Sequence, residues 1–221
     1  AVCVNYRRDE ASAGGVADAI RAGGGTALAM QADVSSEAEV TQLFARIDAE
    51  LGRLTALVNN AGILERQTRV ENIDAARIDR VFATNVRGAF LCAREAVRRM
   101  STARGGGGGA IVNVSSRAAQ LGAPGEYVDY AASKAALDAL TIGLAREVAA
   151  EGIRVNGVRA GIIDTEIHAD GGEPGRVDRL APTLPMRRGG DAIEVARAIL
   201  WLLSDEASYS TATFVDVAGG R

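Results

Sequence analysis

The feature that most constrains the fold of this chain is the alternation of short apolar runs with segments that carry apolar residues at helical spacing. Apolar runs that indicate strands stand at 1–4, 26–31, 54–62, 110–116, 153–160 and 213–217. Segments of helical period lie at about 10–22, 35–51, 74–102, 129–150 and 191–204. Strands separated by helices are typical of a parallel sheet that helices cover on both faces. The sequence therefore predicts an α/β fold with a doubly wound, Rossmann-type parallel sheet in three layers.

Two segments are expected to lack regular structure. Residues 165–190 are rich in glycine and proline and are expected to be irregular, and the glycine run at 105–109 is expected to be a flexible surface loop. No internal repeat and no linker divides the 221 residues, so we expect a single domain over 1–221.

Composition argues against several classes of function. The net charge is −3 and the charges are mixed along the chain, whereas a nucleic-acid surface usually needs a clustered basic face. No apolar run approaches the roughly 18 residues of a membrane span, and no secretory leader is recognisable at the start. Cys3 and Cys92 stand among apolar residues, so we expect buried thiols in a cytoplasmic protein. His168 is the single histidine, which excludes a site with several histidine ligands, and no metal is expected.

Three chemically suggestive stretches follow predicted strands. A doubly wound sheet binds its ligand outside the carboxyl ends of its strands, where the strand order switches direction. Asn59–Gly62 and Ser115–Ser116 stand at the carboxyl ends of such runs, and Gly161–Thr165 comes directly after one. We therefore expect these three stretches to border one ligand site.

Tyr130 and Lys134 form the pair that most suggests proton chemistry. They stand four residues apart near the start of a predicted helix, so they share one face of it, whereas Tyr127 has Ala131 at the same spacing. An ammonium group close to a phenol favours the phenolate, so Lys134 is expected to lower the pKa of Tyr130 from its usual value of about 10. A tyrosine tuned in this way can exchange a proton near neutral pH. A surface pair is the alternative, because this spacing alone is a weak signal.

Ser116, Asn85 and the stretch "NNAG" add to this pair. Ser116 ends a predicted strand, so its hydroxyl group could polarise a carbonyl group in the same crevice, although a serine there is also typical of a helix cap. Asn85 lies inside a predicted helix, where asparagine fits poorly, and it could open the helix to a proton relay. "NNAG" at 59–62 allows close approach of a ligand, with an ordinary turn as the alternative.

Six stretches of the chain together resemble one known family. They are "DV" at 33–34, "NNAG" at 59–62, "TNVRGAF" at 84–90, "IVNVSS" at 111–116, "YAASK" at 130–134 and "IRVNGVRAGIIDTEI" at 153–167. Each is weak alone, but in this order and over nearly the whole chain they resemble the short-chain dehydrogenases/reductases. The likeness is closest to bacterial members that are labelled sugar (glucose) dehydrogenase-like.

The resemblance implies an enzyme that transfers a hydride between a nicotinamide cofactor and a carbonyl or secondary-alcohol substrate. It implies that Tyr130 is the general acid/base, that Lys134 tunes it and holds the nicotinamide ribose, that Ser116 positions the substrate oxygen, and that Asn85 completes a water-linked proton path. It also implies a mobile substrate lid at about 165–190. Members of this family usually form tetramers or dimers, here through the helices at 74–102 and 129–150. Apolar stripes on both helices fit such an interface, and they fit the core of a monomer equally well.

The same resemblance assigns the residues that border the cofactor. They are Asp33 and Val34 at the adenine, Asn59, Ala61 and Gly62 at the adenosine side, Ile163 and Thr165 at the carboxamide and phosphates, and Tyr130 with Lys134 at the ribose. Arg7 follows the second strand of the family pattern, where an acidic residue usually selects NAD. A guanidinium group suits a 2′-phosphate, so NADP is favoured over NAD. A solvated "RRDE" charge cluster is the alternative reading.

The sequence departs from the family pattern in three places. The spacing from Ser116 to Tyr130 is one residue longer than expected, which leaves Ser115 as an alternative. Ala160-Gly161 stands in place of the usual Pro-Gly. The first strand and its glycine-rich T-G-x-x-x-G-x-G turn are not in the sequence, so we expect about 25 to 30 further residues before Ala1 in the natural protein. Two other functions therefore stay open, namely a binding or scaffold protein on the same fold and an atypical dehydratase or isomerase.

Overall fold

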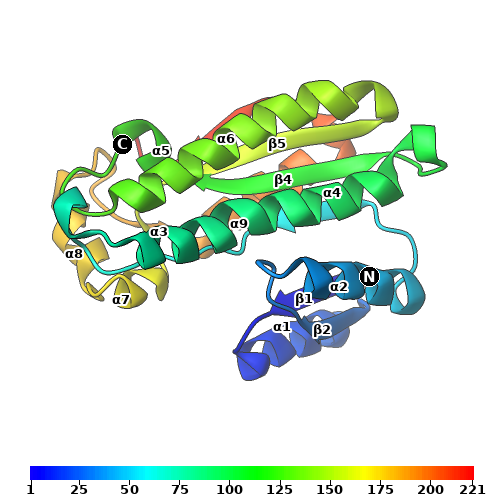
Figure 1. Ribbon diagram of the computed structural model, residues 1–221, viewed down its shortest axis with the longest axis horizontal. Helices are drawn as coiled ribbons and strands as arrows, with labels where there is room; N and C mark the ends of the chain where they lie inside the picture. Colours follow the sequence, from blue (N-terminus) through cyan, green and yellow to red (C-terminus); the bar gives the residue numbers. More distant parts are fainter.

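The computed structural model describes residues 1–221 and has an α/β architecture (Figure 1). The strands are β1 (Val2–Tyr6), β2 (Ala27–Gln31), β3 (Ala56–Asn59), β4 (Gly109–Ser116), β5 (Ile153–Ala160), β6 (Ile163–Asp164), β7 (Gly190–Asp191) and β8 (Phe214–Val217). The α-helices are α1 (Glu10–Ala22), α2 (Glu37–Glu50), α3 (Ala75–Phe82), α4 (Ala89–Met100), α5 (Ala118–Leu121), α6 (Val128–Val148), α7 (Ile167–Asp170), α8 (Arg176–Leu180) and α9 (Ala192–Leu203). Every strand pairing is parallel, as predicted.

The central sheet has a helical layer on each face. Its strand order is β3-β4-β5-β8. Successive side chains of a strand point to opposite faces, so Ile111 of β4 joins the core beneath α4 and α6, while Val112 joins the core beneath α9. Val155 and Val158 of β5 divide between the two cores in the same way. The predicted three layers are therefore confirmed in this part of the chain.

The sheet is interrupted between β1 and β3. β1 and β2 form a two-stranded sheet of their own, and neither pairs with the four-stranded sheet. Figure 1 shows this pair, with α1 and α2, beside the larger sheet. The two parts share one apolar core, in which Val40, Phe44 and Ile47 of α2 lie in the same cluster as Cys92 and Met100 of α4. Packing of α2 on α4 therefore holds the smaller sheet in place.

Local side-chain bonds fix where several helices begin. Asp9 and Ser36 accept hydrogen bonds from the amide groups of Ser12 and Glu39, which caps α1 and α2. α2 thus begins with a serine cap and with the acidic residues Glu37 and Glu39 in its first turn. None of the helices combines the length and the apolar character that a membrane crossing requires.

The helix predicted over 74–102 is divided into three pieces. α3 and α4 flank a π-helical segment, Ala83–Gly88, which contains Asn85. The predicted helical segment is therefore confirmed from Ala75 to Met100, but the apolar spacing gave no sign of the π-helical stretch within it. At the end of this segment Gly88 packs against Val34, in the loop after β2. A Cβ added at Gly88 would lie 2.8 Å from Val34 Cγ2.

Two predictions for the glycine-rich segments were also incomplete. Residues 165–190 contain the short helices α7 and α8 and border the two-stranded sheet β6-β7, so the segment is ordered rather than irregular. The glycine run at 105–109 is closely packed rather than free. A Cβ at Gly106 would overlap the carbonyl group of Met100.

The two apolar stripes differ in burial. In the stripe formed by Ile78, Phe82, Val86 and Phe90, the end residues Ile78 and Phe90 are 42% and 51% exposed. Leu137 and Leu140 of α6 are buried in the core. Burial raises the pKa of the Cys92 thiol to about 12 and that of Cys3 to about 11, as expected for thiols among apolar residues.

The glycine run yields a matched pair of variants. Gly106→Ala is expected to lower the free energy of unfolding by about 1–3 kcal/mol, because the added methyl group has no space. Gly143→Ala is expected to raise it by about 0.5–1 kcal/mol, because Gly143 lies within α6 and an added Cβ would meet nothing within 4 Å. Urea denaturation of both variants measures the difference. Equal stability of the two would contradict close packing of the run.

Candidate active site

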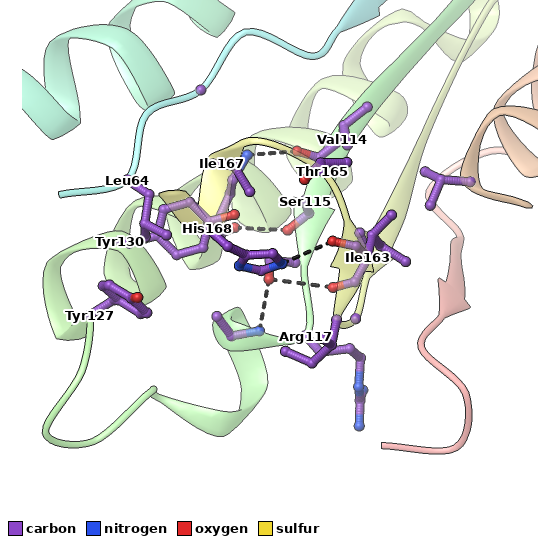
Figure 2. A pocket seen from close by; sticks show the side chains of 18 of the residues that line it. Leu64, Val114, Ser115, Arg117, Tyr127, Tyr130, Ile163, Thr165, Ile167 and His168 are labelled. Carbon is purple, nitrogen blue, oxygen red and sulfur yellow. Dashed lines mark hydrogen bonds between the residues drawn. The ribbon is translucent and has the colours of Figure 1, made fainter. Parts of the chain in front are cut away.

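A cavity of about 700 Å³ opens at the carboxyl ends of β4 and β5 (Figure 2). All three stretches that were expected to border one site contribute to its wall. The predicted residues that line it are Ala61, Gly62, Ser116, Tyr130, Lys134, Ile163 and Thr165. The edge of the sheet therefore brings together side chains that are up to about a hundred positions apart, as the doubly wound topology requires.

Tyr130 and Lys134 lie on the first turns of α6 and face this cavity. The Lys134 ammonium nitrogen is 5.6 Å from the centre of the Tyr130 ring. It donates a hydrogen bond of 2.8 Å to the carbonyl oxygen of Val114 on β4. The Lys134 residue is only 4% exposed. The helical spacing therefore places the pair as predicted, with the ammonium group anchored to the sheet.

The electrostatics of the pair differ from the prediction. Burial raises the pKa of Tyr130 to about 12, and a hydrogen bond with Ser116 opposes this rise. Burial also lowers the pKa of Lys134 to about 8, against the attraction of the Asp138 carboxylate. The expected lowering of the Tyr130 pKa by Lys134 is therefore not met in this structure, because desolvation is the larger effect.

The two serines at the end of β4 have different partners. Ser115 is 2% exposed, and its hydroxyl group donates to the carbonyl oxygen of Lys134 at 3.3 Å. The Ser116 hydroxyl group donates to the Ala160 carbonyl oxygen at 3.4 Å and accepts from the Ala118 amide at 3.1 Å. Ser116, and not Ser115, lowers the pKa of the Tyr130 phenol. The geometry therefore favours Ser116 over Ser115 as the hydroxyl group that works with the phenol.

Asn85 joins the loop after β3 to the helix that carries Tyr130. Its amide oxygen accepts from the Ile63 amide at 2.8 Å, and its amide nitrogen donates to the Ile63 carbonyl oxygen at 3.0 Å. The same nitrogen donates to the Ser133 hydroxyl group at 3.0 Å, and Ser133 donates to the Tyr130 carbonyl oxygen. π-helical segments occur frequently at functional sites, and this one directs a fully buried amide at α6.

Asn59 lies outside the cavity wall. Its side chain is 8% exposed and donates to Asn113 at 2.9 Å, and Asn113 donates to Thr141 on α6 at 2.8 Å. This chain of bonds joins β3, β4 and α6 beneath the site. Asn59 therefore supports the floor of the site, while Asn60, Ala61 and Gly62 reach the cavity.

Arg7, Asp33 and Val34 gather away from the cavity, at the carboxyl ends of β1 and β2. An Arg7 guanidinium nitrogen lies 3.8 Å from an Asp33 carboxylate oxygen, and both side chains are partly exposed. Ser35 donates two hydrogen bonds to Asp33 and, with Arg7, holds the pKa of Asp33 below its usual range in spite of partial burial. Val34 is buried against Gly88.

Sequence reasoning missed several buried groups beside the cavity. His168 and Arg176 belong to the glycine- and proline-rich segment 165–190, yet they are only 7% and 4% exposed. The Arg176 guanidinium group pairs with Glu126 at 2.6 Å and with Glu173 at 3.1 Å, and it lies 5.2 Å from the centre of the Tyr127 ring. Arg176 and Glu126 are fifty positions apart, and no periodicity of the sequence joins them.

A second buried ion pair holds the other side of the first turn of α6. The Arg77 guanidinium group of α3 donates two hydrogen bonds to the Asp129 carboxylate, of 2.7 and 3.1 Å. Arg77 also donates to the carbonyl oxygen of Arg66. Asp129 precedes Tyr130 directly, so this pair fixes the backbone from which the phenol projects.

Comparison with known proteins shows a match along the whole chain. A family model described as enoyl-(acyl carrier protein) reductase matches residues 1–221. An uncharacterized oxidoreductase of Escherichia coli, YgfF, is 60% identical over 220 residues, which are 100% of this chain and 89% of that protein. A solved gluconate 5-dehydrogenase from Burkholderia cenocepacia, in complex with NADP and tartrate, has a TM-score of 0.88 and 30% identity over 100% of this chain and 84% of its own. A double mutant of a Serratia marcescens short-chain dehydrogenase/reductase has a TM-score of 0.89 and 34% identity, covering 100% and 86%.

The burial of Lys134 predicts a pH-dependent effect on stability. Below its folded pKa of about 8 the lysine is charged in both the folded and the unfolded chain, so the folded chain bears the full penalty of burying the charge. Between that value and 10.5 the folded chain loses the proton first, and the penalty fades. Lys134→Met removes a penalty of about 3 kcal/mol and a hydrogen bond worth about 1 kcal/mol.

We therefore expect Lys134→Met to raise the free energy of unfolding by about 2 kcal/mol at pH 7, and by much less at pH 10. Urea denaturation at both values measures this. Lys134→Arg keeps its charge at both values and serves as the control: its own free energy of unfolding is not expected to rise from pH 7 to pH 10 through this position, whereas that of the original protein is. If the gain in the free energy of unfolding of Lys134→Met over the original protein were larger at pH 10 than at pH 7, burial of the lysine charge would not be its cause.

Proposed function

Because this chain belongs to the short-chain dehydrogenase/reductase family of oxidoreductases, we propose that it transfers a hydride between a nicotinamide cofactor and the carbonyl or secondary-alcohol group of a small molecule. The observation that carries this proposal is the convergence of Ser116, Tyr130 and Lys134 on one wall of the cavity. A protein that only binds or supports a partner needs no such arrangement of a phenol, a hydroxyl group and a buried ammonium group.

The state of Tyr130 supports its role as the proton donor in carbonyl reduction. Its pKa of about 12 keeps the phenol protonated near neutral pH. The phenol can then give its proton to the substrate oxygen, on which negative charge develops as the carbonyl group is reduced. Ser116, which lines the same cavity, would donate a second hydrogen bond to that oxygen. In the reverse direction Tyr130 would accept the proton of the alcohol.

The residues beside Gly62 fit a nicotinamide cofactor. A Cβ at this position would lie 3.4 Å from Lys134 Nζ and 3.5 Å from the Asn85 amide oxygen, so the absence of a side chain leaves room for a ligand to approach both groups. Lys134 would hold the hydroxyl groups of the ribose, and Ile163 with Thr165 would border the carboxamide. The bound nicotinamide supplies or accepts the hydride. Asn85 would hold a water molecule in the proton path.

NADP is the proposed form of the cofactor. Arg7 leaves a guanidinium group partly exposed at the carboxyl end of β1, beside Asp33 and Val34, which we propose border the adenine. A guanidinium group can bond a 2′-phosphate through two nitrogens. A related solved structure, the gluconate 5-dehydrogenase, holds NADP. NAD is the alternative, because the Asp33 carboxylate competes for Arg7.

We further propose a cytoplasmic homo-oligomer, either a tetramer or a dimer. The exposed apolar side chains Ile78 and Phe90 on α3 and α4 support a contact between copies of this chain. Two free cysteines support a reducing compartment. The segment 165–190, which contributes Thr165, His168 and Arg176 to the cavity wall, is proposed to act as the substrate lid.

Tyr130→Phe is the direct test of the proton donor. Removing the hydroxyl group is expected to lower kcat by about 10²–10⁴-fold, the usual contribution of general acid–base catalysis. Tyr127→Phe is the matched control, because Tyr127 lies on the same wall and only accepts a bond from Gln67. Its turnover is expected to stay within about ten-fold of the original. NADPH oxidation against a panel of ketones and aldehydes measures both, and equal activity of the two variants would remove Tyr130 from the mechanism.

Cofactor binding is tested by thermal unfolding. NADPH at about 100 times its Kd is expected to stabilise the protein by about 2.7 kcal/mol, and NADH at the same concentration by less. Arg7→Ala is expected to narrow the difference between the two cofactors. No stabilisation by either cofactor would contradict the proposed oxidoreductase activity.

A further inference from the structure

His168 is the one histidine of the chain, and it lies in the cavity wall with Ser116 and Tyr130. It is carried by the short helix α7, and its ring is 7% exposed. Figure 2 shows the imidazole in the middle of the site, between Tyr130 and Ile163. The proposed chemistry uses Ser116, Tyr130, Lys134 and Asn85 and assigns no role to the His168 ring.

The two ring nitrogens of His168 are in different states. Nε2 lies 2.9 Å from the carbonyl oxygen of Ile163. A carbonyl oxygen only accepts, so Nε2 carries the proton and donates it. Nδ1 then bears a lone pair and can only accept while the ring is neutral. No group of the protein donates to Nδ1, although it is shut off from solvent.

A buried acceptor without a donor is uncommon, because it has lost its bonds to water and gained none. The ring also has little tendency to take a second proton. Burial, reinforced by the nearby Arg176 guanidinium group, keeps the pKa of His168 below its usual value. The nearby carboxylates of Asp164 and Glu173 act in the opposite sense and are outweighed. Nδ1 therefore stays an acceptor at neutral pH.

The charged groups around the cavity leave few other contacts for a polar substrate. Arg176 is bonded to Glu126 and Glu173, so its guanidinium group is already paired. Arg117 is bonded to Asp216 and to the carbonyl oxygen of Arg221. Arg221 also lines the cavity, but the buried polar atom without a partner is an acceptor, Nδ1 of His168, and an acceptor suits a hydroxyl group.

We propose that His168 Nδ1 accepts a hydrogen bond from a hydroxyl group of the substrate, so that the preferred substrate is a carbonyl compound that also carries a hydroxyl group. This inference rests on the proposed oxidoreductase function and names its substrate class. Nδ1 is enclosed, so binding requires a small shift of the segment around α7 that opens Nδ1 to the cavity. His168 is thus a specificity-determining residue, and the bond of Nε2 to Ile163 fixes which nitrogen faces the substrate.

The first experiment compares three forms of one substrate skeleton. They are cyclohexanones that carry a hydroxyl group, a methoxy group or only hydrogen at the 2-, 3- or 4-position. The methoxy compound keeps an oxygen at the same position but cannot donate. Because it is larger by one methylene group, the compound with only hydrogen serves as the control for size. For at least one ring position, kcat/KM for the hydroxyl compound is expected to exceed that for the methoxy compound by about ten-fold, the effect of one hydrogen bond.

Two variants of His168 separate its nitrogens. In His168→Gln the side-chain amide can still donate to Ile163, but no acceptor stands at the place of Nδ1, so the ten-fold preference is expected to disappear. In His168→Asn an amide oxygen stands near the place of Nδ1, and part of the preference is expected to return. Glu166→Gln is the control on the same segment, since Glu166 is exposed and outside the cavity wall, and it is expected to keep the full preference.

A second experiment reads Nδ1 directly and needs no turnover. Because the chain has one histidine, ¹⁵N-labelled histidine gives one imidazole, whose unprotonated nitrogen changes its chemical shift when it accepts a hydrogen bond. With NADPH present, 2-, 3- or 4-hydroxycyclohexanone is expected to shift the Nδ1 signal, whereas the methoxy compounds are not.

The outcomes are distinguishable. A preference that survives in His168→Gln, or an Nδ1 signal that no hydroxyl compound moves, overturns the role of His168 while the oxidoreductase activity stands. Absence of turnover for every ketone in the panel overturns the proposed function instead, and the Nδ1 signal still decides whether His168 binds hydroxyl groups.

Discussion

The buried ammonium group of Lys134 is the constraint on which the site depends. It is held by a single backbone carbonyl, that of Val114, and its pKa falls to about 8 because the surrounding protein replaces water so poorly. Holding a charge there is unfavourable, so the fold must position it firmly. α6 supplies that position, since it packs on β4 and β5. The same helix carries Tyr130 one turn earlier. The phenol and the ammonium group are thus kept in one geometry by the packing of one helix on one strand end.

Hydrogen-bonded amides extend this fixed geometry below and beside the helix. Asn59 and Asn113 bond in a line that reaches Thr141 in the middle of α6, while Asn85 bonds the loop after β3 and the first turns of α6. These amides are buried, and each makes the bonds that burial demands. Such networks specify one arrangement more strongly than apolar packing does, because a shifted neighbour leaves a polar group without a partner. The π-helical segment around Asn85 is the local departure from regular structure that this network contains.

Much of this was visible in the sequence, and the remainder has physical reasons for being hidden. The period of apolar residues predicted the strands and the main helices closely, with the first helix falling at Glu10–Ala22 as expected. The spacing of Tyr130 and Lys134 predicted their shared face. Three things escaped prediction because no local pattern encodes them. The register shift at Asn85 arises from bonds to Ile63, the burial of Arg176 depends on Glu126 far along the chain, and the pKa of Tyr130 follows from the depth of the site. The residues expected to bind the cofactor were placed correctly only in part. Gly62 borders the cavity, whereas the Asn59 side chain lies beneath it.

The two ion pairs at the start of α6 have a consequence for how such a chain can be altered. Arg77 holds Asp129 from one side, and Arg176 of the segment 165–190 holds Glu126 from the other. The backbone that bears Tyr130 is therefore held both by α3 and by the segment 165–190. A graft that exchanged residues 165–190 for those of another protein would change the wall of the cavity and would also remove the Arg176 ion pair that holds the start of α6. Residues 165–190 are therefore not an independent unit of this chain. A graft keeps the ion pair only when residue 126 is exchanged together with them.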